Sequence, residues 1–328
     1  MSAEALRWGI LSTARIGVDK VVPATASAAR CEVVAIASRD PDRARAAAAG
    51  LGIGRAFGTY EELLADPDVD AVYIPLPNHL HAPWTIAAAR AGKHVLCEKP
   101  LAMNPAEAER MIQACQAEGV LLMEAFMYRL HPTWEAVREL VASGRIGELR
   151  AVQGWFSYFN DDPSDIRNIV GSGGGALYDI GCYAVNLSRM LFGKEPSRIR
   201  GSVTRDPVMG IDVLTSGILE FPEGVASFTC STRVEPDQRV HVYGTRGRIS
   251  LEIPFNIPPD LPTRVFVTAG GDPPVRPETE TLTFDPVDEY AIQAERFAAA
   301  VLDGTPVPIP PSDAVGNMRV IEELFRIG

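Results

Sequence analysis

A lysine at the end of an apolar run is the first candidate for chemistry. The tripeptide Glu98-Lys99-Pro100 follows the run at 94–98, which has the composition of a buried strand. Ligands of open α/β sheets bind outside the carboxyl ends of the strands, so a lysine there can polarise a substrate oxygen. The alternative is a solvated lysine at a strand end.

A second candidate is a polar stripe within a helical pattern at 175–192. Asp179 and Tyr183 are four residues apart and Asn186 follows three later, so all three share one helix face. The opposite, apolar stripe consists of Ile180, Ala184, Leu187 and Leu191. Three glycines at 173–175 precede the helix and allow a close backbone approach. The polar stripe is either a solvated face or a catalytic one.

The first strand-to-helix turn has the position of a dinucleotide-binding turn. Residues 7–17 read RWGILSTARIG, and the three glycine positions of that fingerprint fall on Ser12, Ala14 and Gly17. Only the third is glycine, but small residues still let backbone amides approach a pyrophosphate. The cofactor-binding residues expected in this turn are Ser12, Thr13, Ala14, Arg15 and Ile16.

The end of the second expected strand favours NADP over NAD. An NAD site usually has an acidic residue there, whereas this chain has Ser38 followed by Arg39, with Arg43 one helical turn on. A guanidinium can hold a 2′-phosphate through two hydrogen bonds. The alternative is that both arginines are solvated residues at a helix start, and NAD remains possible.

Alternating strand and helix patterns in the first 126 residues predict a doubly wound parallel sheet. The expected strands are 6–11, 32–38, 70–76, 94–98 and 120–126. The expected helices are 17–29, 40–49, 60–65, 84–91 and 105–118. We therefore expect a Rossmann domain at 1–126.

The remaining residues, 127–328, predict an α+β domain for substrate binding and oligomerisation. Seven strand patterns without intervening helices lie between 197 and 284, which is typical of a mostly antiparallel sheet. One of the expected turns is at 270–273. The stretch 253–262 holds four prolines and is expected to be an irregular surface excursion. Two helices, 288–302 and 312–326, close the chain.

Composition excludes several classes of protein. The 328 residues carry a net charge of −11, which disfavours nucleic-acid binding. The chain has no run of 18 apolar residues, so no transmembrane helix is expected. Five dispersed cysteines without a CxxC pair, and too few residues ahead of the first strand for a signal peptide, favour a reduced cytoplasmic protein. His79 and His81 lack neighbouring ligands, so no metal is expected.

Four motifs resemble the glucose–fructose oxidoreductase / inositol dehydrogenase (Gfo/Idh/MocA) family. They are LPNHLH at 76–81, AGKHVLCEKP at 91–100, EAFMYRLHP at 124–132 and GGGALYDIGCY at 173–183. Their order and spacing are those of the family, and the Glu-Lys-Pro block is highly specific. The sequence is most similar to the sugar ketoreductase, aldose dehydrogenase and dihydrodiol dehydrogenase branch, because Tyr183 stands where inositol dehydrogenases have histidine.

The resemblance implies a nicotinamide-dependent oxidoreductase that acts on CH–OH groups of a sugar, sugar derivative or cyclitol. Tyr183 would be the acid/base, Lys99 would stabilise its phenolate and the substrate alkoxide, and Asp179 would hold Lys99 or a substrate hydroxyl. The Lys99–Pro100 bond would be cis. The further cofactor contacts are Leu76, Pro77, Asn78, His81, Glu98, Lys99, Met127 and Arg167. For Arg167, contact with substrate or with neither molecule stays open.

Two other functions fit the same fold. One is a cofactor-binding regulator without turnover, and the other is a glycosidase that works by transient oxidation. The presence of both Lys99 and Tyr183 favours the oxidoreductase. The helices are too few to cover both faces of the second sheet, so we expect a homodimer or homotetramer.

Overall fold

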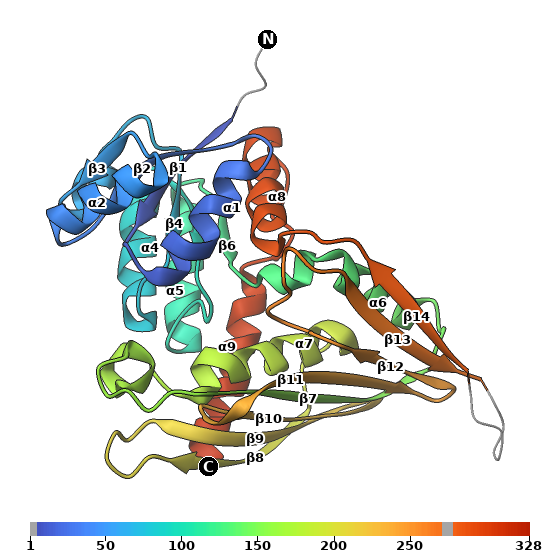
Figure 1. Cartoon of the computed structure of the whole chain (residues 1–328). Helices are drawn as coiled ribbons and strands as arrows, with labels where there is room; N and C mark the ends of the chain where they lie inside the picture. The colour runs from blue at the N-terminus through green and yellow to red at the C-terminus, as the bar shows by residue number, and fades with distance from the viewer. Residues whose placement is uncertain (1–4, 271–277) are drawn as a thin grey trace. The chain divides into compact units, whose positions relative to one another are not determined.

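The computed structural model describes residues 5–270 and 278–328, and most of the turn expected at 270–273 lies outside them. The chain forms two compact units (Figure 1). The first comprises Met1–Met127 and Tyr290–Met318, and the second comprises Tyr128–Glu289 and Arg319–Gly328. A late segment of the chain therefore belongs to the first unit. The domain division at 126/127 stays a prediction.

The first unit contains a six-stranded parallel sheet in the order β3-β2-β1-β4-β5-β6, which is the Rossmann arrangement expected from the sequence. Its strands are β1 (Leu6–Leu11), β2 (Cys31–Ala37), β3 (Arg55–Phe57), β4 (Ala71–Ile74), β5 (His94–Cys97) and β6 (Leu122–Glu124). Strands β4 and β5 are buried along almost their whole length, because helices pack on both faces of a parallel sheet.

Helices alternate with these strands, and their starts follow from local chemistry. The helices are η1 (Gly17–Val21), α1 (Val22–Ser27), α2 (Pro41–Leu51), α3 (Tyr60–Leu64), η2 (Asn78–Leu80), α4 (His81–Arg90) and α5 (Pro105–Ala117), with α8 (Glu289–Asp303) near the end of the chain. Asp40 and Asn104 cap α2 and α5 through their side chains, and each is followed by a proline in the first turn. The Trp8 ring of β1 packs against Phe297 of α8, with 5.4 Å between centroids.

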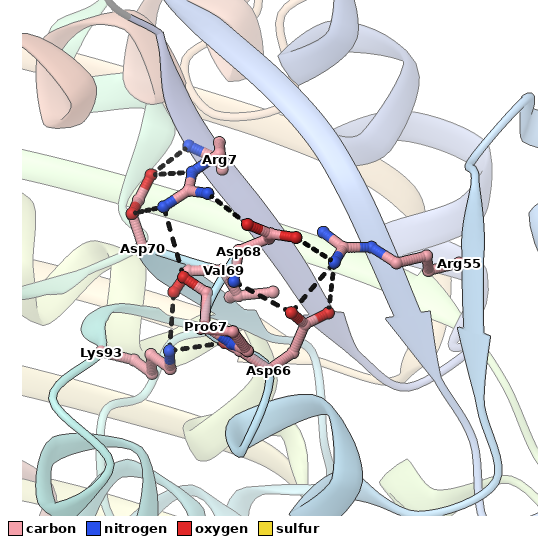
Figure 2. Close-up of polar contacts among 8 residues, drawn as sticks. All are labelled: Arg7, Arg55, Asp66, Pro67, Asp68, Val69, Asp70 and Lys93. Carbon is pink, nitrogen blue, oxygen red and sulfur yellow. Dashed lines mark hydrogen bonds and ion pairs between the residues drawn. The ribbon is translucent and has the colours of Figure 1, made fainter.

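Charged side chains tie together the loops at the amino ends of these strands (Figure 2). Arg7 binds the Asp70 carboxylate with two guanidinium nitrogens, Nε at 2.9 Å and Nη2 at 2.7 Å. Arg55 pairs with Asp66 and Asp68. The Lys93 ammonium donates to the backbone oxygens of Asp66 and Val69 at 2.8 and 2.7 Å. The network fixes the loop that leads into β4, at the edge opposite the carboxyl ends.

The second unit contains an eight-stranded sheet in the order β14-β13-β12-β11-β7-β10-β9-β8. All neighbours are antiparallel except β7 and β10, so the expected mostly antiparallel sheet is confirmed. Its strands are β7 (Leu149–Phe159), β8 (Arg198–Arg205), β9 (Asp212–Phe221), β10 (Gly224–Ser231), β11 (Arg233–Gly244), β12 (Gly247–Leu251), β13 (Thr263–Ala269) and β14 (Thr279–Phe284).

The helices of this unit include α7 (Cys182–Phe192), which continues a π-helical turn, η6 (Leu177–Gly181). The others are η3 (Met127–Leu130), α6 (Pro132–Ala142), η4 (Ile166–Asn168), η5 (Val170–Ser172) and the end of α9 (Ser312–Ile327). Within the described residues, no helix is long and apolar enough to cross a membrane.

The stretch 253–262 has no strand or helix, as expected, and the expectation that it lies on the surface holds only for its second half. Residues 259–262 are exposed, and Leu261 is 57% exposed. Phe255 and Ile257 are buried, and the Trp134 indole donates to the carbonyl oxygen of Pro254 at 2.5 Å. The first half of the stretch is therefore part of the interior of the second unit.

Candidate active site

The loops expected to bind the cofactor follow the carboxyl ends of β1, β2, β4, β5 and β6. Because these strands are parallel neighbours in one sheet, the loops lie at one edge of it. They carry Ser12, Thr13, Ala14, Arg15 and Ile16 after β1, Ser38, Arg39 and Arg43 after β2, Leu76, Pro77 and Asn78 after β4, Glu98 and Lys99 after β5, and Met127 after β6. The first unit thus brings the expected cofactor residues other than Arg167 to one edge.

The turn after β1 has the backbone shape that the glycine fingerprint requires. Ser12 has a φ of 140°, a conformation that favours glycine, and its hydroxyl accepts the N–H of Ala14 at 3.0 Å. Gly17 is buried, and a Cβ there would lie 3.4 Å from the Pro75 side chain. The turn therefore keeps the close helix–strand packing of a dinucleotide site despite having only one of its glycines.

The loop after β2 offers arginines rather than a free carboxylate. The Asp40 side chain accepts the N–H groups of Asp42 and Arg43 at 3.0 and 3.3 Å, so it is used to cap α2. Burial raises the pKa of Tyr60, while the positive charges of Arg39 and Arg43 oppose that rise. The Tyr60 hydroxyl therefore lies in the field of both arginines. These residues fit a 2′-phosphate better than a bare ribose.

The loop after β5 holds Glu98 and Lys99 in a defined arrangement. The hydroxyl of Tyr73, a fully buried residue of β4, donates to Glu98 Oε1 at 2.6 Å. Burial and the Glu98 charge raise the pKa of Tyr73 well above its ordinary value, so this phenol stays a donor. The Lys99 N–H donates to Glu98 Oε2 at 3.3 Å, and the Lys99–Pro100 peptide bond is cis, as the resemblance implied.

His81, an expected cofactor contact, faces the backbone of two loops. Its ring is fully buried, with Nδ1 2.9 Å from the carbonyl oxygen of Pro100 and Nε2 2.8 Å from that of Leu76. Both ring nitrogens therefore face backbone carbonyl groups rather than solvent, and contact of His81 with the cofactor stays a prediction. Adjacent Leu76 and Pro77 are the nearer candidates for that contact.

In the second unit two of the three glycines, Gly174 and Gly175, stand where other groups approach closely, as expected. A Cβ on Gly174 would lie 2.4 Å from the carbonyl oxygen of Arg167, and one on Gly175 would lie 2.0 Å from Asp212 Oδ1. The N–H of Gly175 donates to the same Arg167 oxygen at 2.9 Å. The loop that carries Arg167 is thereby fastened to the start of η6.

Asp179 has two partners within this unit that its sequence position did not reveal. The Tyr158 hydroxyl donates to Asp179 Oδ2 at 2.5 Å, and Arg167 Nε lies 3.3 Å from the same oxygen. The charge of Asp179 raises the pKa of Arg167, and burial together with that charge raises the pKa of Tyr158. Tyr158 and Arg167 thus hold the Asp179 carboxyl in place one helical turn before Tyr183.

Tyr183 lies in an aromatic wall rather than on a solvated helix face. It is 4% exposed, and its ring centroid lies 5.7 Å from Tyr128, 5.6 Å from Phe156 and 5.2 Å from Phe255. Asn186 is buried below it and accepts the Tyr128 hydroxyl at 2.7 Å. The polar stripe predicted from the sequence is therefore an interior feature.

The partners of these groups come from distant parts of the chain. Tyr73 is 25 residues from Glu98, Tyr158 is 21 from Asp179, and Tyr128 is 58 from Asn186. No spacing rule links such pairs in the sequence. Lys99 belongs to the first unit and Tyr183 to the second, so their joint action stays a prediction.

Comparison with known protein families assigns both parts of the chain. Residues 6–126 match the oxidoreductase family with an NAD-binding Rossmann fold, and residues 134–250 match the GFO/IDH/MocA C-terminal domain. The chain belongs to the GFO/IDH/MocA family and is an oxidoreductase.

Individual relatives match nearly the whole chain. The oxidoreductase ORF334 of Rhizobium meliloti is 49% identical, with 98% of this chain and 97% of that one covered. A D-xylose 1-dehydrogenase (NADP(+)) of Haloferax volcanii is 42% identical with the same coverage. The structure of KijD10, a 3-ketoreductase from Actinomadura kijaniata in complex with NADP and TDP-benzene, matches with a TM-score of 0.90, 30% identity and 98% coverage of both chains.

Proposed function

We propose that this protein is an NADP-dependent dehydrogenase or reductase that interconverts a carbinol and a carbonyl carbon of a sugar, sugar derivative or cyclitol. The observation that carries the proposal is the arrangement at the carboxyl edge of the first sheet. There the Ser12 turn, the Arg39 loop and Lys99 follow β1, β2 and β5 of one parallel sheet. Family membership supports an oxidoreductase reaction for the chain.

The cofactor choice rests on the loop after β2. Arg39 and Arg43 would hold the 2′-phosphate, with Ser38 and the Tyr60 hydroxyl beside them. Asp40 is not available to a ribose because it caps α2. Residues 12–16 would bind the pyrophosphate, and Leu76, Pro77, Asn78, Glu98 and Met127 would line the rest of the site. The NADP named with the Haloferax and Actinomadura relatives supports this choice.

Tyr183 and Lys99 would handle the proton at the substrate oxygen. The bound nicotinamide supplies or accepts the hydride. When the carbinol is oxidised, the Tyr183 phenolate oxygen accepts the hydroxyl proton; when the carbonyl is reduced, the Tyr183 hydroxyl returns it. The Lys99 ammonium stabilises negative charge on that oxygen. The aromatic wall excludes water around Tyr183, and Asp179 orients a substrate hydroxyl or Lys99.

A single screen tests this function. Purified protein is mixed with NADP or NADPH and a panel of aldoses, ketoses, deoxyketosugars, cyclitols and glycosides, and absorbance of the reduced cofactor and release of free sugar are followed. Turnover with at least one polyol or carbonyl compound is the expected result. Cofactor binding without turnover across the panel would favour a regulatory protein. Release of a sugar from a glycoside without net change in NADPH would favour a glycosidase.

A further inference from the structure

The backbone that follows Lys99 is held mainly by side chains from other elements. Pro100 has no N–H to donate. The N–H of Leu101 goes to the buried Glu124 carboxylate at the end of β6, 2.7 Å from Oε1. The carbonyl oxygen of Pro100 faces His81 Nδ1 at 2.9 Å. The position of Lys99 therefore depends on side chains outside its own strand.

The two contacts of His81 cannot both be hydrogen bonds when the ring is neutral. A neutral imidazole has one N–H and one lone pair, whereas both of its nitrogens here face carbonyl oxygens, which only accept. Burial lowers the pKa of His81 to about 4, against backbone hydrogen bonds to Pro100 and Leu76 that raise it. At neutral pH one proton therefore serves two loops, and the tautomer decides which loop is fastened.

The loop after β4 needs that proton less than the Lys99 turn does. Residues 78–80 form the short helix η2, and the N–H of Leu80 already donates to the carbonyl oxygen of Pro77 at 2.8 Å. That loop also runs directly into α4, which begins at His81 itself. The turn at 99–101 has Pro100 at its centre, and Pro100 has no N–H to donate. A hydrogen bond from His81 to the Pro100 carbonyl oxygen therefore adds more order there.

We propose that His81 is a positioning residue for Lys99, acting as the Nδ1–H tautomer that donates to the carbonyl oxygen of Pro100. This inference rests on the proposed role of Lys99 in turnover. His81 would touch neither substrate nor cofactor and would act by fixing the turn on which the ammonium is carried. Small displacements of a catalytic group can lower a rate by about a hundredfold, which sets the scale of the expected effect.

Two substitutions separate the two ring nitrogens. His81→Asn keeps a donor near the Nδ1 position and can still reach Pro100, whereas His81→Gln keeps one near the Nε2 position and can reach only Leu76. We expect His81→Asn to retain kcat within about threefold and His81→Gln to lose about 10- to 100-fold. Kd for NADPH should stay within about twofold in both. Equal losses in the two variants, or no loss in either, would overturn the proposal.

His94, at the start of β5, provides the matched control, because Lys99 follows the other end of that strand. His94 Nδ1 accepts the N–H of Leu121 at 2.9 Å, so His94→Gln also changes a half-buried histidine that is bonded to backbone. It should lower thermal stability without the kcat loss of His81→Gln. A kcat loss as large as that of His81→Gln would show that the effect is general to histidine replacement in this unit.

A spectroscopic measurement separates this proposal from the proposed function. The chain has only four lysines, so the ¹³Cε signal of Lys99 can be assigned by its loss in Lys99→Arg. The signal should move in His81→Gln and stay near its wild-type position in His81→Asn, whether or not a substrate is known. An unmoved signal in both variants would overturn the proposal even in an active enzyme.

The unmodified protein gives a test that needs no variant to fold. ¹⁵N chemical shifts of its five histidines distinguish the Nδ1–H from the Nε2–H tautomer. We expect the Nδ1–H form for His81 at pH 7. The Nε2–H form would place the bond on Leu76 and would contradict the assignment.

Discussion

At the scale of single residues, the loop after β2 carries the side chains on which the proposed preference for NADP rests. The loop has an acidic side chain, but Asp40 Oδ1 accepts the N–H groups of Asp42 and Arg43 in the first turn of α2. The positive side chains of Arg39 and Arg43 are left beside the Tyr60 hydroxyl. Ring packing against Trp84, with 4.8 Å between centroids, holds Tyr60 in place.

Arg39→Ala should therefore weaken NADP binding far more than NAD binding. Loss of a charge-assisted hydrogen bond costs about 1.5–3 kcal/mol, which is about a 10- to 100-fold increase in Kd for NADP. Titration calorimetry with both cofactors measures it. Arg45→Ala, which removes an exposed arginine from the adjacent helix α2, should change neither value. Tighter binding of NAD than NADP by the wild-type protein would refute the preference.

Residue types at fixed positions could be predicted from the sequence, but their partners could not. Ser38, Arg39, Lys99 and Tyr183 were identified because each stands at a defined place in a strand end or helix. Tyr60 shares no local pattern with Arg39, since only the folded sheet brings the two together. The two carbonyl groups that the His81 ring nitrogens face could likewise not be predicted, because the fold brings them to the ring.

At the scale of elements, the glycines before η6 hold the Arg167 loop against the helix that carries Tyr183. Gly174→Ala would place a Cβ 2.4 Å from the carbonyl oxygen of Arg167, and backbone must move to relieve it. We expect a loss of about 1–3 kcal/mol in unfolding free energy, measured by urea denaturation. Gly171→Ala is the control, because a Cβ there meets nothing within 4 Å. Equal stability of the two variants would contradict this account.

The Arg7–Asp70 pair should make the stability of the first unit depend on pH. Burial alone would raise the pKa of Asp70, but the hydrogen bonds and charge of Arg7 outweigh it and hold the pKa below its ordinary value. The stabilisation is therefore complete above about pH 4, the pKa of an unfolded aspartate, and is lost as pH falls through the lower folded-state pKa.

Asp70→Asn tests that dependence by urea denaturation at several pH values. Its unfolding midpoint should lie below that of the wild type at pH 7, and the two should converge as the pH falls below about 4. Asp68→Asn removes a more exposed partner of Arg7 and should have a smaller effect, about 0–1 kcal/mol. A gap between Asp70→Asn and the wild type that stays constant with pH would rule out this role for Asp70.

Most elements could be predicted from periodicity, and the failures have physical causes. Strand β3 was missed because three half-buried residues, 55–57, carry no alternating pattern. The start of β11 at Arg233 has no apolar alternation to mark it, because polar residues pair there with β7 across a register shift. The prolines of 253–262 indicated irregular backbone correctly, but not that Phe255 turns inward.

At the scale of the whole molecule, we propose that the chain assembles as a homodimer or homotetramer. The second sheet keeps apolar side chains exposed, Ile218 at 44% and Val225 at 38%. Exposed apolar sheet faces commonly mark interfaces. Light scattering at micromolar concentration should give a mass of two or four chains. A mass near 35.4 kDa would contradict the proposal.

The joint action of Lys99 and Tyr183 is the central claim, and a double-mutant cycle on kcat tests it most directly. Removal of an acid/base group typically lowers a rate by about 10²- to 10⁴-fold, so Tyr183→Phe and Lys99→Ala should each lose activity on this scale. Tyr178→Phe, a tyrosine change in η6 beside Phe325, serves as the control with near-normal turnover. Because the pair acts as a unit, the double variant should be little worse than the worse single one. Multiplied losses would assign the two residues to separate steps, and near-normal turnover in Tyr183→Phe would remove Tyr183 from the mechanism.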